Sequence, residues 1–255
     1  MSTQLVARSV MLALMVWSCC WTIQVIRGTP VGTPELDRDC GLPLTEAELA
    51  CVPTFSKAAP DDFPTSEGDD IVSLPNLPNK NAFVDRKWPN ASAIPYVIDS
   101  AFDVKGRCAI GYAMTQYHKI SCIRFVPRTA QTDYVKINKL DTTVFSCSSS
   151  GLGFYKGRGA HHITLSPSCY QSQPGTIIHE LMHRIGFAHE HNRPDRDKFV
   201  NILWDKIIDK GSVMHYPLGI KMTTKLNTNG AVIGQRDGLS RNDVIKLVLM
   251  YCLRG

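Results

Sequence analysis

The sequence predicts an α+β protein, and three observations predict this class. Short apolar or alternating segments, which are typical of strands, occur at residues 94–99, 122–126, 134–138 and 162–166. Longer segments with helical periodicity occur at residues 104–121 and 176–185. The chain beyond residue 189 is rich in loops until a final amphipathic segment at residues 240–251. We therefore expect a sheet that packs with two helices, followed by a loop-rich region that ends in a helix.

The first of these helices, at residues 104–121, is amphipathic. Its expected apolar side is formed by Ile110, Met114, Tyr117 and Ile120. A loop rich in glycine and serine at residues 146–159 separates the third strand from the fourth. The C-terminal helix is expected to begin after Ser240, a good N-cap residue, with Asp243 as its capping-box partner.

Residues 1–26 are typical of a secretory leader. Arg8 precedes an apolar run that begins at Val10 and continues through Trp21. The alternative is a signal anchor, because the apolar run is almost long enough to span a membrane. We expect a secreted, extracellular protein that has no stable association with a membrane once the signal is removed.

Residues 27–80 form a candidate pro-segment. They carry four Lys/Arg and ten Asp/Glu, a net charge of −6, whereas residues 81–255 carry 23 and 13, a net charge of +10. An acidic segment ahead of a basic domain fits a pro-segment that lies across a basic surface. Within it only residues 44–52 have a helical pattern, with Thr45 as the expected cap. Lys80-Asn81, after a Pro/Asn-rich linker, is the candidate cleavage site for an activating protease.

The basic residues of the second half are scattered rather than gathered in a stripe, which argues against a nucleic-acid partner. Nine cysteines without a CxxC pair favour an oxidising compartment and disulfide bonds. The sequon Asn90-Ala91-Ser92 is compatible with secretion and with glycosylation.

The strongest chemical signal is the pattern of histidines in residues 179–190. On a helix His179 and His183 stand one turn apart on the same face, so both imidazole rings can reach one ion. Gly186 can adopt a positive φ and end the helix, which lets the chain turn back and present His189 as a third ligand. Three neutral nitrogen ligands leave one position of a tetrahedral zinc ion open for water, which is typical of a catalytic site. We expect one zinc ion per chain.

Glu180 follows the first histidine and is rotated about a quarter-turn around the same helix. Its carboxylate can contact a water molecule on the ion without being a ligand. The alternative is a helix that carries three surface histidines by chance, but the complete HExxHxxGxxH pattern is much rarer than HExxH.

The run from His179 to Asp197, HELMHRIGFAHEHNRPDRD, closely resembles the signature of the astacin family of metzincin zinc endopeptidases. Other segments also resemble the family. They are Trp88-Pro89 with Ile94-Pro95-Tyr96 at the start of the mature domain, Cys122-Ile123-Arg124-Phe125 as a central strand, Ser212-Val213-Met214-His215-Tyr216 as the Met-turn, and Leu239 to Cys252 as the closing helix.

The resemblance implies a metzincin-type catalytic domain at residues 81–255. Its upper lobe, at about residues 81–186, would carry a twisted mixed sheet and two helices. The lower lobe, at residues 187–255, would be rich in loops and end in the C-terminal helix. A protein or peptide substrate would lie between the lobes and add a strand to the sheet edge at about residues 162–166.

The resemblance also implies roles for individual residues. His179, His183 and His189 would bind zinc, and Glu180 would act as general base and acid. Met214 would lie beneath the metal, and the hydroxyl of Tyr216 would stabilise the oxyanion. Glu190 would lie near the new amino terminus after processing at about Asn81.

Two disulfides follow from the same comparison, Cys122–Cys252 and Cys147–Cys169. Cys108 is then left over, and either Cys40 and Cys51 pair with each other or one of them holds Cys108. Glu67-Gly68-Asp69 fits the end of the family's FxGD motif, whose aspartate occupies the water position on zinc, although Ser66 stands where the aromatic residue is expected. Asp69 is therefore a candidate latch of the zymogen.

The connection between His189 and Met214 is 25 positions long, which is shorter than is usual in the family. Our expectation is a secreted zymogen of a zinc-dependent endopeptidase with a reduced lower lobe. The alternatives are a zinc-binding but catalytically impaired homologue that acts as a binding or decoy module, and a membrane-anchored form of the protease.

Overall fold

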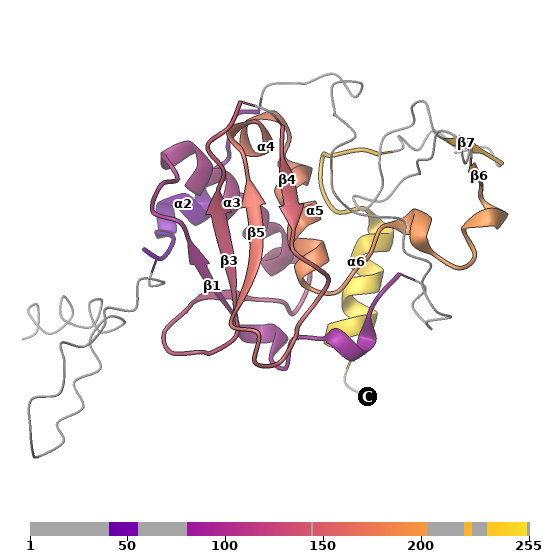
Figure 1. Ribbon diagram of the computed structural model, residues 1–255, viewed down its shortest axis with the longest axis horizontal. Helices are drawn as coiled ribbons and strands as arrows, with labels where there is room; N and C mark the ends of the chain where they lie inside the picture. The colour runs from indigo at the N-terminus through magenta and orange to yellow at the C-terminus, as the bar shows by residue number, and fades with distance from the viewer. Residues whose placement is uncertain (1–40, 56–80, 144, 203–221, 226–233, 254–255) are drawn as a thin grey trace, which may run out of the picture.

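The computed structural model describes residues 41–55, 81–143, 145–202, 222–225 and 234–253, and the statements below concern these residues (Figure 1). The leader, Asp69, Lys80, Met214 and Tyr216 lie outside them, as does Cys40. No helix within the described ranges is long and apolar enough to cross a membrane.

The centre of the fold is a five-stranded sheet. Its strands are β1 (Ile94–Ile98), β2 (Phe125–Pro127), β3 (Tyr134–Lys139), β4 (Cys147–Ser149) and β5 (Ala160–Leu165). Their order across the sheet is β2-β1-β3-β5-β4. The three pairs formed by β2, β1, β3 and β5 are parallel, and β4 is antiparallel to β5. The predicted mixed sheet is confirmed.

The edges of the sheet differ from the prediction in two ways. The strand after Cys122 is an edge strand rather than a central one, because β1 pairs with β2 on one side and with β3 on the other. The Gly/Ser loop contains β4, so β4 and not residues 162–166 forms the opposite edge. Three residues of which two are serines carry too little apolar periodicity to indicate a strand.

Five α-helices occur in the described residues. They are α2 (Glu46–Ala50), α3 (Val104–Ile120), α4 (Pro167–Ser172), α5 (Pro174–Arg184) and α6 (Arg241–Leu247), which continues as a π-helical turn over Val248–Cys252. Short 3₁₀ turns occupy Val84–Arg86, Ala91–Ala93, Glu190–Asn192 and Arg196–Lys198. The capping box of Ser240 and Asp243 is present, which confirms the predicted start of the C-terminal helix.

Helices α3 and α5 pack together behind the sheet in the view of Figure 1. Ile110, Met114 and Tyr117 of α3 are completely buried, as the amphipathic pattern predicts, and the hydroxyl of Tyr117 donates a 2.6 Å hydrogen bond to the carbonyl of Ile178. Ile120, the last residue of the helix, is 38% exposed, because at about 100° per residue it is turned roughly 120° away from Met114 and does not share this face. The pairing of α3 with α5 fixes the position of the histidine-bearing helix.

The C-terminal end of α5 is held from two sides. The indole Nε1 of Trp88 donates a 2.8 Å hydrogen bond to the carbonyl of Arg184, and the hydroxyl of Tyr251 donates one of 2.8 Å to the carbonyl of Ile185. Carbonyl groups at a helix end lack partners within the helix, so these side chains satisfy them. The segment that contains Trp88 and the final helix thereby position the turn that follows His183.

Three disulfides join the described parts. Cys122–Cys252 and Cys147–Cys169 are present as the resemblance implied. Cys51 is bonded to Cys108, which decides between the two open pairings and excludes a Cys40–Cys51 bridge.

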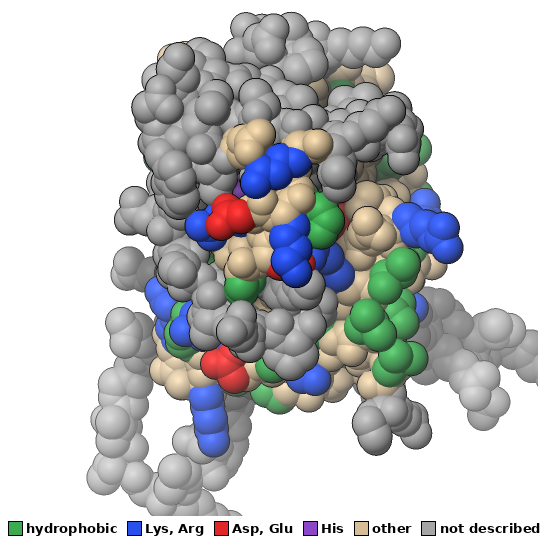
Figure 2. Space-filling view, turned by 90° about the vertical axis from the view of Figure 1, so that its right-hand side faces the viewer, with side chains coloured by type: hydrophobic (Ala, Val, Ile, Leu, Met, Phe, Trp, Pro, Cys, Tyr) green, Lys and Arg blue, Asp and Glu red, His purple; other side chains and the backbone are tan. Residues whose placement is uncertain are grey.

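Beyond residue 189 the described chain consists of short turns and one two-stranded sheet, β6 (Val200–Ile202) with β7 (Met222–Thr224), before α6. The predicted loop-rich region is thus confirmed for the parts of residues 187–255 that the structure describes. Figure 2 shows the molecule from the side on which these segments lie. On the described part of that face, Lys and Arg side chains are mixed with Asp and Glu and form no continuous basic stripe.

Candidate metal centre

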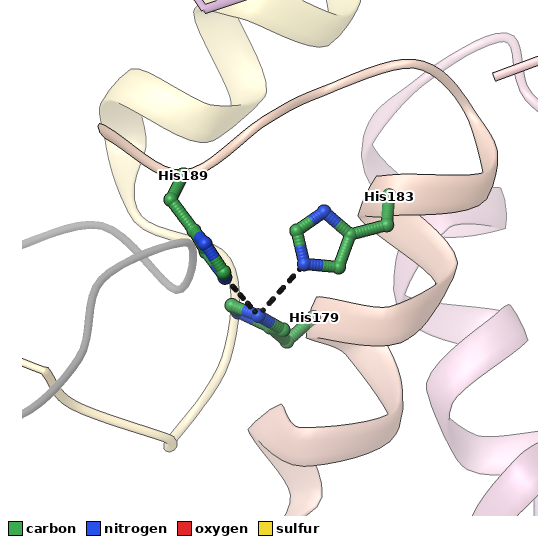
Figure 3. Close-up of side chains that lie close together, drawn as sticks. All are labelled: His179, His183 and His189. Atoms are coloured by element: carbon green, nitrogen blue, oxygen red, sulfur yellow. Dashed lines mark hydrogen bonds between the residues drawn. The ribbon is translucent and has the colours of Figure 1, made fainter. Parts of the chain in front are cut away.

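Three histidines come together at the end of α5. The Nε2 atom of His179 lies 3.1 Å from Nε2 of His183 and 3.1 Å from Nε2 of His189 (Figure 3). Each side chain is about 1% exposed. In a tetrahedral zinc site with Zn–N bonds of 2.0–2.1 Å, ligand nitrogens lie about 3.3 Å apart. The observed separations therefore fit a zinc ion, and among the described residues this is the one cluster of three suitable donors.

The sequence produces this geometry through the end of the helix. Gly186 adopts φ +97°, in the left-handed region that other residues rarely enter. The amide of Phe187 then donates to the carbonyl of Met182 at 3.1 Å, which is the bond that closes a helix at a glycine. The chain reverses there and returns His189 to the face of α5 that carries the other two histidines.

The ring of His183 is oriented by a second contact. Its Nδ1 lies 2.8 Å from the carbonyl oxygen of Phe187, and because a carbonyl can only accept, Nδ1 carries the proton. The lone pair of Nε2 is then directed toward the other two rings. Such a partner behind a histidine is the usual way in which a protein fixes a metal ligand.

The electrostatics also favour neutral ligands. Burial, and then the neighbouring rings of His183 and His179, lower the pKa of His189 well below 6.5. His191 stacks on His189, with ring centroids 5.0 Å apart and planes at 17°, and is itself buried. Three neutral imidazoles and one open position are the donor set of a catalytic zinc site.

Glu180 is 2% exposed and follows His179 on α5. The structure therefore places it beside the histidines on the same rigid element. The other predicted site residues, Tyr216 and Met214, fall outside the described residues, so their positions stay predictions.

The comparisons with known proteins agree with this arrangement. Residues 80–216, more than half of the chain, match the family model described as Astacin, a family of peptidases. The chain belongs to the astacin family. Its members are zinc metalloendopeptidases, so the resemblance of the histidine motif and the predicted metzincin-type fold are both confirmed.

Several relatives show the extent of the similarity. The chain is 35% identical to zinc metalloproteinase nas-8 of Caenorhabditis elegans, over 65% of this chain and 46% of that protein. It is 42% identical to nas-8 of Steinernema carpocapsae, over 65% and 44%. With the mouse astacin-like metalloendopeptidase the identity is 29%, over 89% and 56%. The chain thus spans about half the length of these relatives.

Among solved structures, high choriolytic enzyme 1, a hatching enzyme zinc-protease from the medaka Oryzias latipes, superposes with a TM-score of 0.57 at 31% identity. The match covers 68% of this chain and all of that one.

Next to the metal centre lies a buried carboxylate, Glu190. Its Oε1 accepts a 2.8 Å hydrogen bond from Nδ2 of Asn81 and forms an ion pair with Nζ of Lys246. Its Oε2 accepts a 2.9 Å hydrogen bond from Nη1 of Arg193. The backbones of Asn81 and Ala188 also join, with N–H of Ala188 donating to the carbonyl of Asn81 at 2.8 Å. The predicted proximity of Glu190 to residue 81 is therefore observed.

Two features of this region are not predictable from the sequence. Lys246 lies 56 positions from Glu190, and no local pattern connects an α6 lysine with a turn after the third histidine. His191 has no spacing that distinguishes it from the other histidines of the chain, yet its ring stacks on that of His189, a metal-ligand candidate.

Proposed function

We propose that this chain is the zymogen of a secreted zinc-dependent endopeptidase that hydrolyses peptide bonds in proteins. The observation that carries the proposal is the convergence of three buried imidazole Nε2 atoms, with Glu180 beside them on the same helix. Membership of a family of zinc peptidases supports the same reaction.

His179, His183 and His189 would hold the ion, which when bound would lower the pKa of water and polarise the carbonyl of the substrate. Glu180 would accept a proton from the attacking water and transfer it to the amide nitrogen that leaves. The hydroxyl of Tyr216 would donate a hydrogen bond to the developing oxyanion, and Met214 would lie beneath the histidines as an apolar floor. The carbonyl of Phe187 keeps the His183 ring in its ligating tautomer throughout.

The substrate would be an extended protein segment. The outer edge of β4 is the sheet edge nearest α5, and its middle residue Ser148 is exposed. An extended peptide can add to such an edge through backbone hydrogen bonds. This edge replaces the one that the sequence suggested at residues 162–166.

We further propose that residues 1–26 are a signal peptide, residues 27–80 a pro-segment with Asp69 as its latch, and residues 81–255 the catalytic domain. A protease that cleaves at Lys80-Asn81 would activate it. Asn90 is exposed and its amide oxygen accepts hydrogen bonds from both Ser92 N–H and Ser92 Oγ, so its nitrogen can receive a glycan.

The test is proteolysis of an unfolded protein substrate by the processed chain, with zinc content measured by metal analysis. The expected result is one zinc per chain, activity lost with a chelator and restored by zinc, and activity reduced at least about 100-fold in Glu180→Gln. Glu180→Gln should keep its zinc. A zinc-loaded wild-type protein that cleaves nothing while Glu180→Gln is equally inert would instead support a binding or decoy module.

A further inference from the structure

The described part of the proposed pro-segment, residues 41–55, is built into the catalytic domain. It comprises α2 and the turns on either side of it, and it packs along α3. Twenty-five residues, 56–80, separate it from the proposed cleavage point. A pro-segment that is only an inhibitor has no need of such a fixed attachment far from the metal centre.

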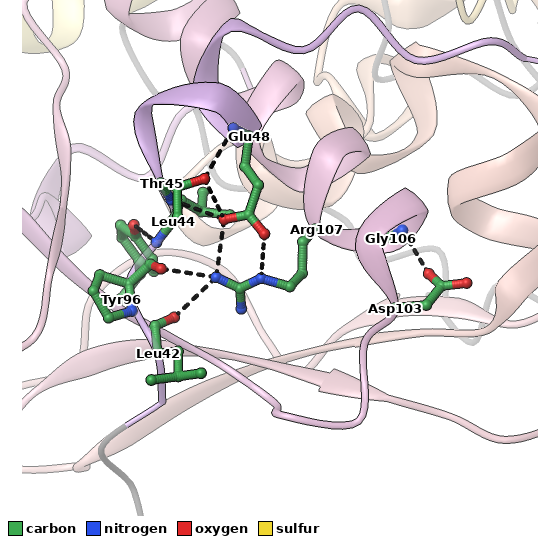
Figure 4. A network of polar contacts seen from close by, with 9 residues as sticks. Leu42, Leu44, Thr45, Glu48, Tyr96, Asp103, Gly106 and Arg107 are labelled. Carbon is green, nitrogen blue, oxygen red and sulfur yellow. Dashed lines mark hydrogen bonds and ion pairs between the residues drawn. The ribbon is translucent and has the colours of Figure 1, made fainter.

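A single arginine of α3 joins several parts of this segment (Figure 4). Arg107 Nε donates to Oε1 of Glu48 at 2.6 Å and Nη2 donates to Oε2 at 3.1 Å, which makes a two-pronged pair. The same Nη2 donates to the carbonyls of Pro43, at 2.8 Å, and Leu42, at 3.2 Å. The hydrogen bonds from Arg107 hold the pKa of the Glu48 carboxyl below 4.5. Both side chains are largely shielded from water, so the pair is better defined than an ordinary surface ion pair.

Apolar and backbone contacts extend this attachment. Leu44 is 7% exposed and belongs to the main hydrophobic core, and its N–H donates to the hydroxyl of Tyr96 on β1 at 3.1 Å. The hydroxyl of Thr115 on α3 donates to the carbonyl of Leu49 at 3.0 Å. The segment therefore contributes to the core rather than covering it loosely.

A glycine in α3 fits this interpretation independently. A Cβ at Gly111 would lie 2.3 Å from the carbonyl oxygen of Glu48, a distance that real structures do not allow. Glycine in the middle of a helix costs about 1 kcal/mol relative to alanine. Its presence at this position is explained by the close approach of α2.

The attachment is also covalent, because Cys51 is bonded to the buried Cys108 of α3. In Figure 1 α2 lies at the left of the molecule, with α3 between it and α5, whereas α6 lies on the opposite side. The described segment thus lies away from the three histidines and from the β4 edge.

We propose that residues 41–55 remain attached after activation, so that the mature enzyme consists of two chains joined by Cys51–Cys108. This rests on the proposed processing at Lys80-Asn81. The short chain remains packed against α3 and β1 and stabilises them in the mature enzyme. Cleavage breaks the chain between Lys80 and Asn81, but residues 41–55 stay bound to the catalytic domain.

The test forces the cleavage, so that it does not depend on the natural activator. In the full chain, residues 75–80 are replaced by the recognition sequence of a site-specific protease that cuts before Asn81. The expected result, by mass spectrometry in denaturant, is one disulfide-linked species without reductant and two fragments with it. A short fragment that separates without reductant would overturn the proposal.

A second variant tests the noncovalent docking. With Cys51→Ser and Cys108→Ala added, the cut fragments should still co-elute in native gel filtration, and Leu44→Ala with Glu48→Ala should abolish co-elution. If the fragments separate in the cysteine variant that still has Leu44 and Glu48, the noncovalent docking is contradicted. N-terminal sequencing of the naturally processed protein is a separate measurement. A natural cut elsewhere would refute the proposed processing, but would leave the result of the forced cut intact.

Discussion

The side-chain amide of Asn81 donates a 2.8 Å hydrogen bond to Oε1 of Glu190, across 109 positions of the sequence. The first residue is the one that would begin the mature chain, and the second directly follows the third histidine. A buried carboxylate on the residue after the third histidine therefore anchors Asn81.

Removing the charge of Glu190 should destabilise this region strongly. Glu190→Ala leaves the side chain of Lys246, which is mostly shielded from water, without its carboxylate partner. Breaking a buried ion pair from one side costs about 3–5 kcal/mol of the free energy of unfolding. Denaturant unfolding measures it. The double variant Glu190→Gln with Lys246→Met should recover much of the loss, and a double variant as unstable as Glu190→Ala would show that the ion pair is not the cause.

Zinc-binding measurements should distinguish the three converging histidines from His191, the fourth histidine of this region. Alanine at His179, His183 or His189 is expected to abolish stoichiometric zinc binding, because two remaining ligands cannot complete the site. His191→Ala keeps all three ligands and removes only the ring stacked on His189. Metal analysis after dialysis should give close to one zinc for it, with at most about a tenfold weaker affinity. Complete loss in His191→Ala would mean that His191 is itself a ligand.

Folding stability should rise with pH between about 4 and 6.5. Burial, and then the nearby Arg184, lower the pKa of His161 to about 4, with the carboxylate of Asp133 opposing them from 4.0 Å. The unfolded chain therefore binds a proton in this window that the folded chain does not bind. The contribution of the neutral His161 ring to the free energy of unfolding is fully present above pH 6.5. It is lost as the pH falls toward 4, which lowers the free energy of unfolding by about 2–3 kcal/mol.

The matching measurement is denaturant unfolding at several pH values for the wild type and for His161→Phe. The ring of His161 lies among Trp88, Phe154 and Tyr155, so phenylalanine suits the site. Burial also lowers the pKa of His118 to about 4 and that of His189 well below 6.5, so the variant should lose part of the dependence, and these two rings should contribute to what remains. An unchanged slope in His161→Phe would disprove the role of this ring.

Gly111→Ala should destabilise the intact chain, although alanine favours helices. In an exposed helix the change would stabilise the protein by about 1 kcal/mol. Here the added Cβ would collide with the carbonyl of Glu48 and push α2 away from α3. The expected result is a net loss of about 1–3 kcal/mol by thermal unfolding. A stabilised variant would show that α2 does not pack closely on α3 in solution.

The metal centre was predictable because the residues that form it are close together in the sequence. His179, His183, Gly186 and His189 lie within eleven positions, and helix geometry with one positive φ determines how their side chains meet. The capping boxes of α2 and α6 were predictable for the same reason, since each depends on residues three positions apart.

What the sequence could not predict depends on contacts between distant segments. The pairing of Cys51 with Cys108 follows from the docking of α2 on α3, which no spacing of cysteines determines. Lys246 meets Glu190 only because the C-terminal helix lies against the end of α5, where the hydroxyl of Tyr251 donates to the carbonyl of Ile185. The strand β4 is too short to show a period, and it became visible only through its register with β5, in which Cys147 pairs with Leu165.

The disulfide of that edge strand has a consequence for how a substrate would be positioned. Cys147 on β4 is linked to Cys169 on α4, and α4 is followed almost at once by α5. A peptide aligned along β4 would therefore lie on a strand that is covalently fixed relative to the histidine helix. Moving the peptide by one residue would shift its backbone about 3.3 Å and turn every side chain to the opposite face. The bond presented for cleavage would then be chosen by register along the strand as much as by the identity of any side chain.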